Sequence, residues 1–232
     1  MRIHDLLTMS TGHDPVPRLK GEEETWTKQF FQKKVPHTPG TVFRYNTAAT
    51  YMQSTIVQKV TGEKIVDYLQ PRLFDPLGID PPKWDESPQG VSIGGYGLYL
   101  KTEDIAKFGQ LFLQKGKWKG KQLVPAKWVE EATSKQVKNN LRDPDWRQGY
   151  GYQFWQCRHG AYRGDGHAGQ FCVVLPKQNA VVIMTADNRN LQGQLSLVWK
   201  HLLLAFEDKP LKEDSCAQEQ LKKQMSNLKA SH

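Results

Sequence analysis

The chain has 232 residues, of which 38% are hydrophobic, so it is long enough for one domain or for two lobes that share a core. Three cysteines are an odd number, which argues against a framework of disulfides. No apolar run reaches the roughly 20 residues of a membrane helix, and residues 1–5 lack the charged-then-apolar order of a signal peptide. We therefore expect no membrane partner and do not assign a cellular location.

The basic residues give a formal net charge of +8, yet they are scattered along the chain apart from residues 115–121. That run has glycines at turn spacing and is predicted to be a solvated hairpin tip. A basic chain raises the prior for an anionic partner, but no nucleic-acid-binding motif supports one. We expect no nucleic-acid partner.

Residues 1–147 are predicted to form a helical lobe. The apolar spacing predicts helices at residues 21–34, 46–61, 65–73, 102–112 and 125–132. Gly62 follows the second of these as a C-terminal cap, and the third is expected to end before Asp75.

From Tyr150 the apolar period changes to two, which indicates strands. We predict strands at residues 150–157, 161–164, 170–175 and 180–186, a turn at 176–179 and a helix at 193–206. Residues 148–206 would form an antiparallel sheet with a closing helix, and 207–232 a polar tail that is weakly helical or disordered. The fold class is α+β, and the small sheet would have one long exposed edge unless another segment covers it.

The segment DGHAGQF, residues 165–171, is predicted to be a strand that opens with small residues at the lip of a pocket. His167 would point into the cleft that the glycines border. The alternative is a strand edge with a satisfied surface histidine. Cys157 and Cys172 lie on candidate strands and are expected to be buried free thiols.

Tyr45, Asn46 and Thr47 stand where an extended segment meets the start of a helix. A tyrosine there can project into a cleft with an amide beside it. The alternative is a half-buried packing residue, because an aromatic body with a polar tip suits that position.

Two other nucleophile arrangements are open. Residues 90–94 match Gly-x-Ser-x-Gly, but neither a strand before nor a helix after is predicted, so the strained elbow of that motif is missing. Ser10, His13 and Asp14 lie too close in sequence to converge as a triad without an unusual loop.

A metal site is also open. Cys157, His159, His167 and Cys172 could meet across two strands as tetrahedral zinc ligands. Their spacing matches no compact zinc signature, so we expect no metal and no cofactor.

Four segments in order carry a resemblance: IHDLLTMSTG (3–12), PGTVFRYNT (39–47), GGYGLYLKTEDIAKF (94–108) and HAG (167–169). They resemble motifs of the β-lactamase-related serine hydrolases, which include class C β-lactamases, penicillin-binding-protein-like peptidases and esterases. Residues 39–47 resemble the family's Tyr-Asn-Ser/Thr motif, and residues 167–169 resemble its His-x-Gly or Lys-Thr-Gly motif. The resemblance implies a β-lactamase/transpeptidase-like fold and acyl transfer from an amide or ester, such as a β-lactam, a peptide or a carboxylic ester.

The resemblance also implies roles for individual residues. Tyr45 would be the general base or acid, which requires its pKa to fall from about 10, and His167 would face the substrate's carboxylate side or bond to the serine–tyrosine network. The other implied substrate-binding residues are Asn46, Thr47, Gly169 and Gln170, with the Gln170 N–H as half of an oxyanion hole.

The family's Ser-x-x-Lys nucleophile motif occurs only at residues 226–229, in the polar tail, where we interpret it as chance. The family's N-terminal helix and first strands are also absent. We therefore expect the chain to be the C-terminal part of a longer protein, inactive alone, with a missing N-terminal segment that docks on the sheet edge. The alternative is a non-catalytic module that binds a peptide or cell-wall ligand.

Overall fold

The computed structural model describes residues 1–207, 209 and 212–228. The chain divides into two compact units, Met1–Leu195 and Ser196–His232. The predicted divisions after residues 147 and 206 stay predictions.

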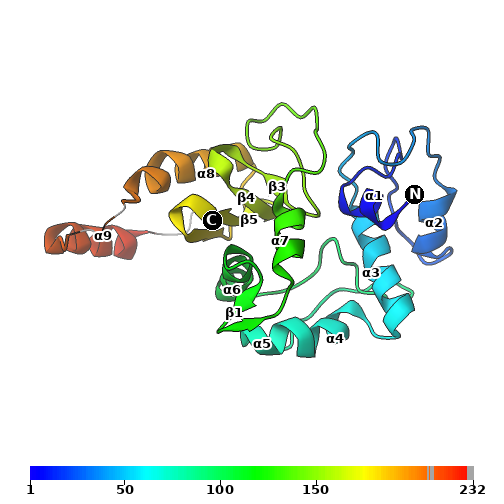
Figure 1. Cartoon of the computed structure of the whole chain (residues 1–232), viewed down its shortest axis with the longest axis horizontal. Helices are drawn as coiled ribbons and strands as arrows, with labels where there is room; N and C mark the ends of the chain where they lie inside the picture. The colour runs from blue at the N-terminus through cyan, green and yellow to red at the C-terminus, as the bar shows by residue number, and fades with distance from the viewer. Residues whose placement is uncertain (208, 210–211, 229–232) are drawn as a thin grey trace. The chain divides into compact units, whose positions relative to one another are not determined.

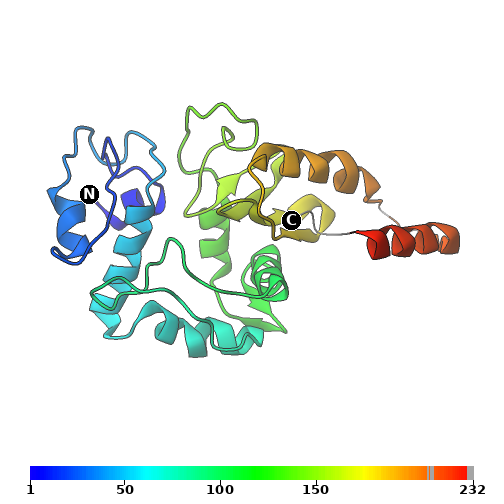
Figure 2. The ribbon, with the colours of Figure 1, turned by 180° about the vertical axis from the view of Figure 1, so that it is seen from behind.

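Helices dominate the first part of the first unit (Figure 1). They are α1 (Ile3–Leu7), α2 (Trp26–Gln32), α3 (Thr47–Thr61), α4 (Ile65–Leu69), η1 (Gln70–Phe74), α5 (Asp75–Leu77), α6 (Thr102–Leu113) and α7 (Ala126–Thr133). Figures 1 and 2 both show α4 and α5 between α3 and α6. The predicted end before Asp75 is wrong: the helical path continues to Leu77, because Pro71 and Pro76 each lie in the first turn of a new segment, where a missing N–H costs little.

The strands of the main sheet run antiparallel in the order β3-β4-β5-β6. They are β3 (Trp155–Gln156), β4 (Tyr162–Gly166), β5 (Gln170–Leu175) and β6 (Ala180–Met184), and a separate hairpin pairs β1 (Lys117–Trp118) with β2 (Lys121–Gln122). The predicted strand at 150–157 is reduced to β3, because Gln153 has a φ of 65° and interrupts the extended backbone.

Helix α6 packs against β5 and β6. Gly109 permits this approach, since a Cβ there would lie 2.8 Å from Cys172 Sγ on β5. Residues 171–175 of β5 are all buried, whereas every residue of β6, the last strand of the sheet, is half-buried. Cys157 and Cys172 are buried free thiols, as predicted. The helices and the antiparallel sheet confirm the α+β class.

The second unit contains η4 (Val198–Leu202), η5 (Leu203–Ala205) and α9 (Ser215–Asn227), and α8 (Leu191–Leu197) crosses the division. Asp214 caps α9 by accepting a hydrogen bond from the Ala217 N–H. The residues of α9 are exposed. No helix in the described part of the chain has the length and apolar character needed to cross a membrane.

Candidate active site

A cavity of about 700 Å³ lies where the helical part and the sheet of the first unit meet. Its lining comprises Tyr45, Thr47, Gly95, Tyr96, Leu141, Trp146, Trp155, Asp165, Gly166, His167, Ala168 and Leu191. Tyr45 and His167, which are far apart in the sequence, therefore share one cavity. Cavities of this size are typical of small-molecule sites.

Tyr45 packs among aromatic rings. Its ring stacks on Trp155 at 5.5 Å between centroids and meets the edge of Tyr150 at 6.4 Å. The residue is 46% exposed, yet burial of its hydroxyl and then the charge of Asp165 raise the pKa of Tyr45 to about 12. The expected fall in this pKa is wrong for the described chain, because burial disfavours the phenolate and the charge that acts on it is a carboxylate rather than a cation.

Asn46 is fully buried and is not part of the cavity lining. Its side-chain oxygen accepts from the Ala48 N–H at the start of α3, and its Nδ2 donates to Thr11 Oγ1 at 3.1 Å. Asn46 therefore fixes the segment that carries Tyr45 and Thr47, as an N-cap does.

His167 lies in the turn of the β4–β5 hairpin. The predicted strand at 165–171 is wrong in its centre: residues 167–169 form the turn, with Ala168 and Gly169 at φ of 59° and 92°, so the chain reverses there. The turn presents His167 and Ala168 to the cavity. Gly169 and Gln170 lie outside the lining; Gln170 begins β5 opposite Gly166.

Asp165 supplies a carboxylate to the cavity, and the sequence analysis did not identify it as a site residue. Arg163, two positions earlier on the same face of β4, donates from Nη2 to Asp165 Oδ2 at 3.0 Å. Burial raises the pKa of Asp165, against the opposing effect of Arg163 and of the indole groups of Trp155 and Trp146. The sequence signal that could have identified Asp165 is the alternation of Arg163 and Asp165 with glycines along one strand.

Arg163 is fully buried and holds the wall of the cavity. Its guanidinium carbon lies 4.2 Å from the centroid of the Trp146 ring, and its Nη1 donates to the carbonyl oxygen of Asp145 and to Cys157 Sγ, each at 3.0 Å. These contacts tie the loop that carries Trp146 to the sheet.

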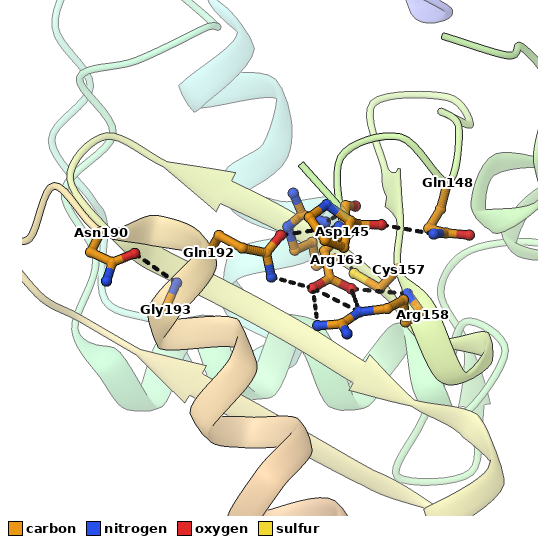
Figure 3. A network of polar contacts seen from close by, with 9 residues as sticks. Asp145, Gln148, Cys157, Arg158, Arg163, Asn190, Gln192 and Gly193 are labelled. Atoms are coloured by element: carbon orange, nitrogen blue, oxygen red, sulfur yellow. Dashed lines mark hydrogen bonds and ion pairs between the residues drawn. The ribbon is translucent and has the colours of Figure 1, made fainter. Parts of the chain in front are cut away.

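The Asp145 carboxylate extends this network, as Figure 3 shows. It is fully buried, accepts from Arg158 Nη2 at 3.0 Å and accepts from Gln192 Nε2 at 2.6 Å. A buried carboxylate needs such partners. The network therefore fixes both the loop before β3 and the start of α8 beside the cavity.

The alternative nucleophiles are not formed. Ser92 is fully buried in an irregular segment, so the Gly-x-Ser-x-Gly interpretation is wrong. His13 is also buried and contacts Thr11 Oγ1 at 3.0 Å, while the Ser10 hydroxyl contacts Thr8, so the close triad is wrong as well.

The zinc alternative also fails. Among the described residues, no three His, Cys, Asp or Glu side chains lie so as to hold a metal ion. Cys172 lies on β5, where it pairs with Gly164 of β4, whereas Cys157 follows β3. Strand β4 therefore lies between the two cysteines, and His167 lines the cavity instead.

Comparison with known proteins gives a family and a fold. The family model described as Beta-lactamase matches residues 1–203. The 6-aminohexanoate-dimer hydrolase of Paenarthrobacter ureafaciens is 26% identical over 164 residues, which are 65% of this chain and 42% of that protein. The chain thus spans less than half the length of that relative.

Two solved structures illustrate the fold. The penicillin binding protein from Bacillus halodurans has a TM-score of 0.66 at 17% identity, covering 87% of this chain and 72% of that one. The D-amino acid amidase from Ochrobactrum anthropi SV3, complexed with D-phenylalanine, has a TM-score of 0.65 at 15% identity, covering 88% and 78%. At these identities the likeness concerns the β-lactamase/transpeptidase-like fold.

Proposed function

Because the chain belongs to the Beta-lactamase family, whose model matches residues 1–203, we propose that it supplies the tyrosine, the histidine and the walls of an acyl-transfer site in a serine hydrolase. The substrate is a small molecule or peptide whose amide or ester carbonyl is attacked by a serine and then by water. The observation that supports this most directly is that Tyr45 and His167 line one cavity.

In this proposal the lysine of the Ser-x-x-Lys segment takes up the proton of the attacking serine, and Tyr45 acts as an acid. Its pKa of about 12 keeps the phenol protonated at neutral pH, so its hydroxyl donates a hydrogen bond or a proton to the departing group. Its use as a base requires a cation close enough to lower that pKa. His167 and Thr47, which both line the cavity, contact the substrate.

In this proposal the attacking serine is not one of the described residues that line the cavity. Among the described residues that line the cavity there is no serine or cysteine. The literal Ser-x-x-Lys at 226–229 ends in Lys229, which lies outside the described residues. We propose that the chain alone forms no acyl-enzyme and that a segment carrying Ser-x-x-Lys docks beside β6, the end strand of the sheet.

The test uses a fluorophosphonate probe and a penicillin probe, with labelled serines mapped by mass spectrometry. We expect no labelling of the chain alone, and labelling after addition of a family fragment that carries Ser-x-x-Lys. Tyr45→Phe should abolish the restored labelling, whereas Tyr99→Phe, an exposed tyrosine outside the cavity, should not. A labelled serine on the chain alone would refute the missing nucleophile, and labelling insensitive to Tyr45→Phe would refute its catalytic role.

A second candidate function is a non-catalytic binding module, which the lack of a serine or cysteine among the described lining residues favours. A peptide or cell-wall fragment would then raise the melting temperature without forming a covalent product. The shift should disappear in Tyr45→Phe and in His167→Ala. An unchanged melting temperature with such ligands would exclude this function.

A further inference from the structure

The charged groups of the cavity are unevenly placed. Asp165 supplies a carboxylate to the lining, and among the described lining residues there is no lysine or arginine side chain. A ligand carboxylate would therefore meet a carboxylate with no lysine or arginine beside it in the described lining.

The guanidinium of Arg163 does not cancel this charge for a ligand. Its side chain is 0% exposed and sits behind Asp165, whereas the Asp165 side chain is 13% exposed and lines the cavity. A ligand therefore approaches the carboxylate more closely than the guanidinium. Because the Coulomb energy falls with distance, the nearer negative charge dominates at the ligand.

The aromatic walls favour the same sign of charge. Tyr45 and Tyr96 expose 46% and 54% of their surface beside the carboxylate, and Trp155 stacks on Tyr45. Ring faces carry negative charge density and attract ammonium groups within about 6 Å. One carboxylate among exposed aromatic rings is a combination that recognises organic cations.

We propose that the cavity binds the primary-ammonium end of an amide or ester substrate beside Asp165 and discriminates against a carboxylate at that position. Asp165 is then a specificity-determining residue. The inference rests on the proposed function for its amide or ester class, but the charge preference concerns binding alone. It differs from the expectation that a substrate carboxylate lies beside His167.

The environment of Tyr45 agrees with this assignment. The charge that acts on its phenol is that of Asp165, which adds to burial in raising the pKa of Tyr45. The negative potential of Asp165 therefore extends across the part of the cavity where the proposed acyl transfer would take place.

The experiment compares three ligands of similar shape: 3-phenylpropylamine, 3-phenylpropanamide and 3-phenylpropanoate. Calorimetry on the full chain at neutral pH and low ionic strength should give the tightest binding for the amine, at least about tenfold tighter than for the carboxylate. Asp165→Asn should reduce that ratio to less than about threefold. Asp67→Asn, which removes an exposed carboxylate outside the cavity lining, should leave it unchanged.

Circular dichroism checks that Asp165→Asn folds, and the wild-type ranking decides the question if it does not. Equal or tighter binding of the carboxylate by the wild type would overturn the proposal, as would failure of all three ligands to bind. A tenfold preference that survives in a folded Asp165→Asn variant would overturn the role of Asp165. Covalent labelling tests the reaction separately, so its failure with the ligand order intact would refute only the proposed function.

Discussion

Replacing Arg163 by methionine tests whether the buried ion pair holds the cavity together. The guanidinium is fully buried, pairs with Asp165, donates to the Asp145 carbonyl and Cys157 Sγ, and covers the face of Trp146. Methionine has a comparable apolar volume and none of these donors. The variant therefore leaves Asp165 as a mostly buried carboxylate without its cation.

The expected loss follows from that uncompensated charge. Removing one partner of a buried ion pair costs about 3–5 kcal/mol. Arg163 Nε already has no hydrogen-bond partner, so its removal relieves one unsatisfied group and places the loss near the lower end, about 3 kcal/mol. That is a large share of the roughly 5–15 kcal/mol by which a domain is stable.

Urea unfolding followed by circular dichroism measures the loss. The double variant Arg163→Met/Asp165→Asn should be more stable than Arg163→Met by about 1–2 kcal/mol, because no buried charge remains without a partner. Arg72→Met is the matched control: its guanidinium also covers a ring, that of Tyr68 at 3.9 Å, but its side chain is 48% exposed. We expect that control to cost about 1 kcal/mol or less.

Two results would refute this account of the network. A loss below about 1 kcal/mol in Arg163→Met would mean that water or a rearranged loop compensates Asp165 without the guanidinium. A double variant less stable than either single variant would mean that the two charges contribute independently rather than as a pair.

The remaining predictions concern a titration and two backbone positions. The absorbance difference between the wild type and Tyr45→Phe should show no phenolate at pH 9 and should show it near the pKa of about 12; Asp165→Asn should move the transition to lower pH, because a neighbouring negative charge disfavours the phenolate. Asn46→Ala should cost about 1–2 kcal/mol in urea unfolding, since it removes the N-cap of α3 and a buried hydrogen bond. Gly12→Ala should lower the free energy of unfolding in urea by more than about 2 kcal/mol, because its φ is 84° and a Cβ would collide with the backbone carbonyl oxygen of His37. The control Gly21→Ala, at a φ of 72° in open space, should lower it by only about 1 kcal/mol.

Elements whose limits are set by local chemistry were predictable from the sequence. Strand β5 has its predicted bounds, because its apolar run lies between Gln170 and Pro176. Helix α3 begins within one residue of the prediction, since Asn46 is a preferred N-cap, and it ends where Gly62 adopts a left-handed conformation. The strand expected at 150–157 failed because tertiary contacts place Gln153 at positive φ.

The candidate site was predictable only in part, for a similar reason. The motif resemblance identified Tyr45 and His167, and the structure brings both to one cavity. It did not identify Asp165, because the importance of that carboxylate depends on packing against Trp155 and Tyr45 from distant segments. The expected direction of the Tyr45 pKa shift was wrong on the same account, since sequence order shows neither how far the phenol is buried nor which charge acts on it.

Asp165 links the charge preference of the cavity to the proton state of Tyr45. Because burial and then the charge of Asp165 raise its pKa, the phenol of Tyr45 is a proton donor and a poor base. A cation drawn to Asp165, whether on the substrate or on a nucleophile segment, would offset that charge and lower the pKa of Tyr45. Linkage then requires the phenolate form to bind the cation more tightly by the same factor. The phenolate of Tyr45 would therefore form more readily once its cationic partner is in place, while burial, the larger cause of the raised pKa, stays unchanged.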